Sequence, residues 1–169
     1  MALQAPQPLE PQHSTAGFDC GDDGLNRWLQ QRALANQGSG ASRTFVVCDG
    51  AGMVKAFVAL ASGAVAGAAS PGRFRRNMPD PIPVVVLARL AVDQSVQGQG
   101  LARALLADAF ERVAQASEQI GVRGILVQAA SPAATAFYLK MGFESSPLDP
   151  ATLMVRLSDL REVLGRRFT

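Results

Sequence analysis

The most restrictive feature of this sequence is an apolar run at residues 84–92 that leads through a glycine-rich turn into a long amphipathic segment. Apart from Arg89 the run is apolar throughout, which is typical of a strand buried on both faces of a sheet. Gly98 and Gly100 interrupt it, and apolar side chains then recur with helical periodicity over residues 100–119. A buried strand, a tight turn and a long helix in succession indicate an α/β fold with a mixed sheet.

The other segments predict shorter elements of both kinds. The remaining predicted helices cover residues 22–36, 131–142 and 158–166. Asp22 or Asp23 would cap the first of them, and Ser131 the second. The remaining predicted strands, including a hairpin with its turn at 49–52, cover residues 44–48, 53–61, 122–129 and 152–157. Residues 37–42 predict a loop, and the proline-rich segment 70–83 predicts a second loop because its prolines exclude a central strand.

Length and composition limit the organisation of the chain. Its 169 residues, 48% of them apolar, suffice for one full core, so we expect a single domain over residues 1–169 with residues 1–14 as a flexible leader. Cys20 and Cys48 fit neither a disulfide framework nor a metal site. The N-terminus lacks a signal peptide, and the stretch 56–69 is too short to span a bilayer. We therefore expect a cytoplasmic protein without a membrane partner.

The glycine-rich turn suits a bound phosphate group. A glycine loop between a strand and a helix directs backbone N–H groups to one place, where the positive end of the helix dipole also lies. Gly98, Gly100 and the small Ala102 would let a pyrophosphate approach the main chain. Residue 103 is arginine, so the G-x-G-x-x-G dinucleotide fingerprint is incomplete, and no G-K-(S/T) Walker sequence follows. A tight turn with a packing glycine is the structural alternative.

Two motifs in this part of the chain resemble those of one enzyme family. Gln97-x-x-Gly100-x-Ala102 resembles the (R/Q)-x-x-G-x-(G/A) pyrophosphate signature of the GCN5-related N-acetyltransferase (GNAT) family. Residues 136–144 resemble the family's A-x-x-F-Y-x-x-x-G-F element, which follows the next strand. The resemblance implies the GNAT fold, in which a mixed central β-sheet is flanked by helices and a splayed strand pair holds acetyl-CoA. It implies no metal.

The resemblance also assigns roles to individual residues. The main chain of residues 90–92 would bind the pantetheine arm like an added half-strand, and Phe137 would pack beside the coenzyme or, alternatively, in the core. The implied coenzyme-binding residues are Leu90, Ala91, Val92, Gln97, Gly98, Gln99, Gly100, Leu101, Ala102, Arg103 and Phe137.

Tyr138, the single tyrosine of the chain, would be the general acid. A phenol, with a reference pKa of roughly 10, is a reasonable proton donor to a departing thiolate. The alternative is an amphipathic tyrosine between helix and sheet. No general base is assigned, and Asp93 is the nearest candidate.

Residues 15–157 resemble more narrowly the TacT-type toxin branch of the family. The segments that carry this likeness include residues 18–21, 41–46 and 152–154. Members of that branch acetylate the α-amine of aminoacyl-tRNA, which blocks translation, and are inhibited by a ribbon–helix–helix antitoxin; they are commonly homodimers. The chain departs from the branch where Phe57 and Val58 replace tyrosines, so the acceptor pocket differs in detail.

A cluster of arginines is the predicted contact for tRNA. Arg73, Arg75 and Arg76 lie in the proline-rich loop, and with Arg89 they would bind the phosphate backbone without reading sequence. The net charge of +2 is too small to indicate a nucleic-acid partner by itself. Alternatives for the loop are a solvated surface or an antitoxin-docking site. Alternatives for the protein are an acetyltransferase of small amines or protein N-termini, and a non-catalytic acyl-CoA-binding module.

Overall fold

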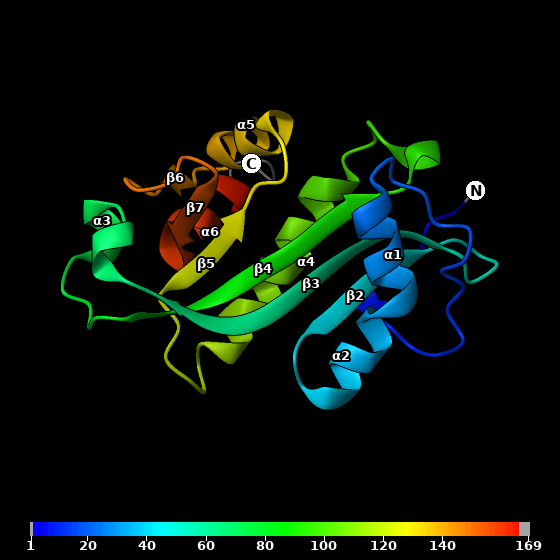
Figure 1. Cartoon of the computed structure of the whole chain (residues 1–169), viewed down its shortest axis with the longest axis horizontal. Coiled ribbons are helices and arrows are strands. Elements are labelled where there is room, and N and C mark those ends of the chain that lie inside the picture. The colour runs from blue at the N-terminus through cyan, green and yellow to red at the C-terminus, as the bar shows by residue number, and fades with distance from the viewer. Residues whose placement is uncertain (1, 166–169) are drawn as a thin grey trace. The chain divides into compact units, whose positions relative to one another are not determined.

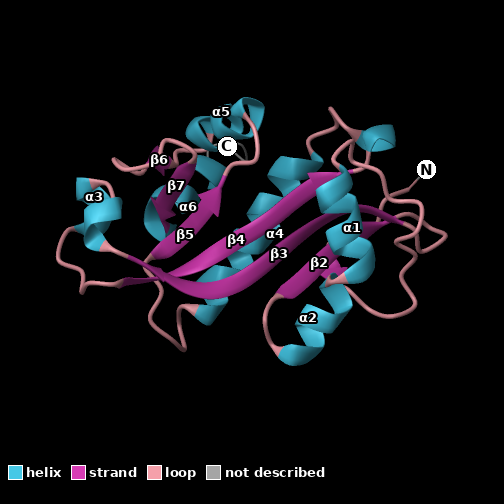
Figure 2. Cartoon of the chain, in the orientation of Figure 1, coloured by secondary structure: helices cyan, strands magenta, loops and turns pink. Residues whose placement is uncertain are grey.

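The structure, a computed structural model, describes residues 2–165. Its seven strands follow the order β1-β2-β3-β4-β5-β7-β6 along a mixed sheet with flanking helices (Figures 1 and 2). The strands are β1 (Gln7–Pro8), β2 (Arg43–Cys48), β3 (Val54–Val65), β4 (Ile82–Val92), β5 (Gly124–Gln128), β6 (Glu144–Ser145) and β7 (Thr152–Arg156). The helices are α1 (Asp23–Gln31), α2 (Ala33–Ser39), α3 (Gly72–Arg75), α4 (Leu101–Ala116), α5 (Pro132–Lys140) and α6 (Leu157–Gly165).

The chain forms two compact units. The first comprises Met1–Ala61 and Ala88–Ala109, and the second comprises Ser62–Leu87 and Phe110–Thr169. Strands β3 and β4 and helix α4 each contribute residues to both units. The expected single domain stays a prediction, and each unit is described by itself.

The first unit is built on the β2–β3 hairpin. The two strands pair antiparallel from Arg43↔Leu60 to Cys48↔Val54, with a bulge near the turn. Helix α1 begins at Asp23 and is capped, as predicted, by Asp22, whose carboxylate accepts the N–H of Leu25. The core that the helices and hairpin enclose contains Leu9, Phe18, Leu29, Ala33, Val46, Cys48, Val54, Phe57 and Ala91.

Residues 2–14, which belong to the expected flexible leader, include a short strand and a buried side chain. Gln7 and Pro8 form β1, which pairs antiparallel with Val46 and Phe45 of β2. Leu9 is 2% exposed and belongs to the core of the first unit. Composition alone suggested a leader because the segment is rich in proline and glutamine, but main-chain pairing and one buried leucine are enough to hold it against the hairpin.

The predicted helix 22–36 is two helices in the structure. Arg32, with φ of −120°, separates α1 from α2. Helix α2 then continues to Ser39, so the predicted loop at 37–42 is helical over its first part. Gly40 ends the helix in the left-handed conformation at φ of 86°. Gln37 secures this helix end: its amide donates to the carbonyl of Leu9 and accepts the N–H of Thr44.

The second unit contains the parallel pairing of the sheet. Val84–Leu87 of β4 pair parallel with Gly124–Val127 of β5, and β4 continues to Val92. β5 pairs antiparallel with β7, which also carries the short β6. Helices α3, α5 and α6 contact β7 (Figure 1). As predicted, Ser131 caps α5 by accepting the N–H of Ala134, and Pro132 occupies its first turn.

The proline-rich segment 70–83 is more ordered than predicted. It contains the helical turn α3, and β4 already begins at Ile82. Phe74 of α3 is 3% exposed and packs in the core of the second unit with Ile82 and Met154. One buried aromatic side chain therefore anchors a segment that its prolines and arginines had suggested was an irregular loop.

Candidate active site

The glycine loop connects β4 to α4 within the first unit. After a short 3₁₀ turn, Gln94–Val96, residues 97–100 are exposed. Gly98 and Gly100 have φ of 79° and 81°, and an added Cβ at either would meet no heavy atom of the described chain within 4 Å. These glycines therefore provide a left-handed conformation that other residues adopt at a cost, as well as open space beside the main chain. A loop of this shape at a helix N-terminus suits an anion.

The other predicted coenzyme residues of this unit flank the loop. Leu90, Val92, Leu101, Ala102 and Arg103 are partly exposed, whereas the Ala91 side chain is 7% exposed and packs in the core. Residues 90–92 are predicted to bind through main-chain groups. A buried side chain at Ala91 is compatible with that role.

Gln97, the first residue of the signature, acts through its side chain on the end of β4. Its Nε2 donates to the carbonyl of Val92 at 2.9 Å and to the carbonyl of Cys20 at 3.3 Å. The amide thus closes the loop back onto the strand and onto the segment before α1. Gln97 therefore stabilises the conformation of the loop within this unit.

Asp93, the nearest candidate for a general base, is engaged by hydrogen-bond donors. Its carboxylate accepts the N–H of Asp19 and both the N–H and the hydroxyl of Ser95. Burial raises its pKa, but these hydrogen bonds and the charge of Lys55 together lower it by more, so the net shift is downward. A carboxylate with a lowered pKa and occupied oxygens is a poor base, and we do not assign it that role.

Arg89 lies against an aromatic cluster that the sequence did not reveal. Its guanidinium is 4.5 Å from the ring centroid of Trp28, and burial lowers its pKa. Trp28 stacks on Phe57 at 5.9 Å, and Phe57 meets Phe18 edge-on at 5.5 Å. The branch often has tyrosine at residue 57, but here the side chain is fully buried among these rings, where a hydroxyl would need a partner. Trp28 is the single tryptophan of the chain.

Tyr138 is held in an aromatic enclosure in the second unit. Its ring meets Phe137 at 5.1 Å and Phe143 at 5.2 Å, both edge-on, and the residue is 4% exposed. The N–H groups of Met141 and Phe143 donate to its carbonyl, so the chain turns back over it through Gly142, at φ of 92°. Burial raises the pKa of Tyr138. The phenol therefore stays protonated and remains a hydrogen-bond donor throughout the neutral and mildly alkaline range.

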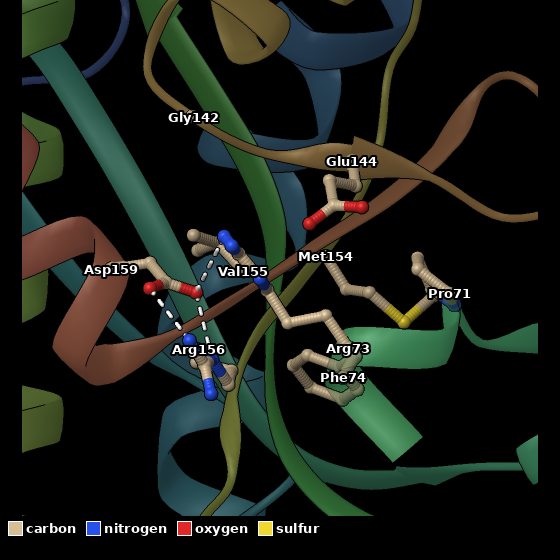
Figure 3. Close-up of a pocket in the computed structure, with 9 residues that line it drawn as sticks. All are labelled: Pro71, Arg73, Phe74, Gly142, Glu144, Met154, Val155, Arg156 and Asp159. Atoms are coloured by element: carbon tan, nitrogen blue, oxygen red, sulfur yellow. Dashed lines mark hydrogen bonds and ion pairs between the residues drawn. The ribbon is translucent and has the colours of Figure 1, made fainter. Parts of the chain in front are cut away.

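The arginines of segment 70–83 differ from one another in their surroundings. All three are exposed, but Arg73 also forms an ion pair with Asp159 at 3.9 Å. Arg156 donates to both carboxylate oxygens of Asp159 at 2.8 and 2.9 Å (Figure 3). The residues that line the hollow at this place are Pro71, Arg73, Phe74, Gly142, Glu144, Met154, Val155, Arg156 and Asp159.

Arg123, the residue directly before β5, supports α3 through its side chain. The sequence did not predict a role for it. Its Nε donates to the carbonyl of Phe74 at 2.9 Å and its Nη2 to that of Arg73 at 3.1 Å. Its guanidinium also lies 5.9 Å from the Phe74 ring centroid. With Arg156 and Arg73 it surrounds Asp159, whose pKa is lowered by the Arg156 hydrogen bond first and then by these charges, although burial opposes the shift. Glu144 lines the same hollow and its charge acts on Arg156, so three guanidinium groups meet two carboxylates and this part of the second unit keeps an excess positive charge.

Comparisons with known proteins agree with the two motifs. The family model for the acetyltransferase (GNAT) domain matches residues 41–145. Over 161 residues the chain is 49% identical to the tRNA-acetylating toxin of Mycobacterium tuberculosis, covering 95% of this chain and 96% of that one.

Among solved structures, AtaT complexed with acetyl-methionyl-tRNAfMet matches with a TM-score of 0.86 at 27% identity, covering 99% and 100% of the two chains. A mutant AtaT toxin bound to the C-terminus of the antitoxin AtaR and acetyl-CoA matches with a TM-score of 0.81 at 25% identity, covering 96% and 98%.

The chain belongs to the GNAT family and is an acetyl-CoA-dependent N-acetyltransferase. The predicted fold class is confirmed, and so is the narrower likeness, because the similarity to a tRNA-acetylating toxin spans nearly the whole chain. Within residues 2–165 no helix is long and apolar enough to cross a bilayer. The same residues hold no group of three or more His, Cys, Asp or Glu side chains placed to bind a metal ion.

Proposed function

We propose that this chain is the toxin of a type II toxin–antitoxin pair and acetylates the α-amine of aminoacyl-tRNA, which blocks translation. The observation that carries the proposal is the 49% identity, over nearly the full length of both chains, to a tRNA-acetylating toxin. Charged tRNA is a cytoplasmic substrate, so we propose a cytoplasmic location. A ribbon–helix–helix antitoxin is the proposed inhibitor, and the homodimer stays a prediction that light scattering would check.

The proposed coenzyme site is the end of β4 and the glycine loop. Main-chain groups of residues 90–92 would bind the pantetheine arm, and N–H groups of residues 97–103 would bind the pyrophosphate. Support comes from the open space at Gly98 and Gly100, which leaves the main chain accessible. The N-terminus of α4 adds the positive end of its helix dipole. Phe137 would pack beside the coenzyme.

Tyr138 is the proposed general acid. Acetyl-CoA supplies an activated acetyl thioester, and the neutral α-amine attacks the carbonyl carbon. The new C–N bond forms, the C–S bond breaks, the nitrogen loses a proton to water, and the departing sulfur receives a proton from the phenol. Support comes from the place of Tyr138 in the second GNAT motif and from its protonation state, because burial raises its pKa and the phenol carries its proton at neutral pH. The phenol recovers its proton from solvent after the product leaves.

Exposed arginines are the proposed tRNA contacts. Arg75 and Arg76 offer guanidinium groups to the phosphate backbone, and Arg73 does so in competition with Asp159. Arg89, whose guanidinium lies over the Trp28 ring at 4.5 Å, would offer its N–H donors to an anionic group of the acceptor end. Such contacts bind the backbone and carry no sequence information, so they position the acceptor stem whichever amino acid it carries.

One experiment separates the proposed function from its alternatives. The protein is incubated with labelled acetyl-CoA and, in parallel, charged tRNA, the same tRNA without its amino acid, free amino acids with other small amines, and peptides with free N-termini. We expect label in charged tRNA alone. Preferential labelling of amines or peptides would assign the chain to another acceptor class. Tight coenzyme binding without transfer to any acceptor would identify a non-catalytic module.

A further inference from the structure

We propose that Asp93 is the positioning residue of the coenzyme loop. Its buried carboxylate holds residues 94–100 in the conformation that presents main-chain N–H groups to the pyrophosphate of acetyl-CoA. The inference rests on the coenzyme site proposed above and goes beyond it, because Asp93 belongs to neither GNAT motif. It also gives a function to a carboxylate that the transfer reaction does not use.

The contacts of Asp93 join three parts of the first unit. Oδ2 accepts the N–H of Asp19 at 2.9 Å, and Oδ1 accepts the N–H and hydroxyl of Ser95 at 2.9 and 2.7 Å. Its own N–H donates to the carbonyl of Lys55 in β3 at 2.8 Å, and its carbonyl accepts the N–H of Val96 at 3.0 Å. With 7% exposure, the residue is a buried junction at the point where β4 ends and the loop begins.

Further hydrogen bonds extend this junction to the start of α1. The N–H of Gln94 donates to the carbonyl of Asp19 at 2.9 Å, and the side chain of Gln97 donates to the carbonyl of Cys20. Asn26 of α1 donates to the Asp19 carboxylate at 3.1 Å and accepts the N–H of Cys20 at 2.9 Å. The loop is therefore fastened at Asp93, Gln94 and Gln97 to a segment that α1 itself holds in place, while residues 98–100 stay exposed.

A carboxylate is required here because both of its oxygens accept N–H groups. In an asparagine the Nδ2 group would face either the N–H of Asp19 or the donors of Ser95, placing donor against donor. Asp49 provides a contrast in the same unit. It is also buried, at 6% exposure, but Oδ1 alone accepts the N–H groups of Ala51 and Met53, so asparagine can replace it.

Charge and conformation make opposite predictions for this position. A negative carboxylate near a pyrophosphate site opposes anion binding, so neutralising it would strengthen coenzyme binding if charge were decisive. If the carboxylate instead sets the loop's conformation, the same substitution weakens binding. The direction of the change therefore distinguishes a positioning residue from a passive nearby charge.

The test compares Asp93→Asn with the matched control Asp49→Asn, and uses Gly100→Ala to probe the coenzyme site itself. For each variant we measure the Kd of CoA by calorimetry, the KM for acetyl-CoA, kcat with saturating substrates, and Tm. For Asp93→Asn we expect the Kd and KM to rise by about tenfold, with kcat nearly unchanged, since the pyrophosphate does not react and its contacts bind ground state and transition state equally. For Asp49→Asn we expect Kd and KM to stay at wild-type values.

Each outcome has a definite reading. Unchanged or tighter CoA binding by folded Asp93→Asn, with weakened binding by Gly100→Ala, overturns the positioning role and leaves the coenzyme site standing. Unchanged binding by folded Gly100→Ala rejects the coenzyme site and the inference with it. If Asp93→Asn does not fold, Ser95→Ala replaces it, because that change removes one hydroxyl donor from the same carboxylate. A KM for acetyl-CoA that is raised with unchanged kcat then supports the proposal, and an unaltered KM overturns it.

Discussion

The glycine loop of the first unit and the arginine segment of the second are both proposed phosphate-binding elements, yet they are built in opposite ways. The glycine loop offers main-chain N–H groups, and its conformation depends on positive φ values and on the buried Asp93. The arginine segment offers side-chain charge from α3, which Phe74, Arg123 and Asp159 hold in place. One element depends on shape and the other on charge, so the two should respond differently to salt and to the loss of a neighbouring carboxylate.

The largest expected effect lies outside both elements. If the glycine loop and the arginine segment only bind phosphate groups, the chemical step depends on Tyr138. Tyr138→Phe should then lower kcat by about 10² to 10⁴. The ring keeps its contacts with Phe137 and Phe143, so the Kd values of CoA and charged tRNA should stay near wild type. Single-turnover transfer with calorimetry of the same variant measures both. A kcat within threefold of wild type would return Tyr138 to a packing role.

The charge-based element should show the next largest effect. Replacing Arg75 and Arg76 together by Ala should raise the KM for charged tRNA by roughly 10- to 100-fold, while the KM for acetyl-CoA stays constant. Each lost phosphate contact should also flatten the log–log salt dependence of tRNA binding by roughly 0.7 to 0.9. Arg73→Ala is the internal comparison and should have less effect, because Asp159 already pairs with that guanidinium. An unchanged salt slope in the double variant would make antitoxin docking the better explanation of α3.

The shape-based element can be tested with a matched pair of glycines. Gly100 and Gly40 have φ of 81° and 86°, and both have open space where a Cβ would lie. Alanine at either position should therefore lower stability by a similar amount, about 1 kcal/mol. Only Gly100→Ala should weaken CoA binding, by about tenfold, because its methyl group enters the space proposed for the pyrophosphate. Equal CoA affinity in the two variants would remove the loop from the coenzyme site.

The smallest expected effect has the most informative sign. Asp159→Asn should tighten tRNA binding by about two- to fivefold, since it releases Arg73 from a competing carboxylate. Asp93→Asn should instead weaken coenzyme binding, so two like substitutions act in opposite directions. Weaker tRNA binding by Asp159→Asn would mean that Asp159 orients the Arg73 side chain, as Asp93 is proposed to orient the glycine loop.

Asp159 should also make stability depend on pH. Its pKa is lowered in the folded protein, so its contribution is complete above the unfolded-state pKa of about 3.9 and is lost as the pH falls through the folded value. The Tm difference between wild type and Asp159→Asn should therefore be full at pH 7 and vanish in strong acid. Since the carboxylate is partly exposed, the difference at pH 7 should correspond to about 1 kcal/mol or less.

Local patterns in the sequence predicted the elements that depend on neighbours along the chain. The apolar run before Gly98, the periodic helix after it, the Ser131 cap with Pro132, and the β2–β3 hairpin all lie close to where they were expected. Strand pleat, helix period and capping are properties of short segments, so residue order is enough to predict them. The two family motifs likewise needed only short spacings to indicate a GNAT acetyltransferase.

Tertiary structure decided what depends on partners distant in sequence. Asp93 accepts a hydrogen bond from a residue 74 positions away, which turns a candidate base into a support for the loop. Arg123 reaches the carbonyl of Phe74 across 49 positions, and it makes a predicted basic loop an anchored helical turn. The stacking of Arg89 on Trp28 is equally non-local. The type of a residue determines which hydrogen bonds its side chain can donate or accept. Only the folded chain determines which partner group lies beside that side chain, because the partner depends on strand pairing and helix packing rather than on order along the backbone.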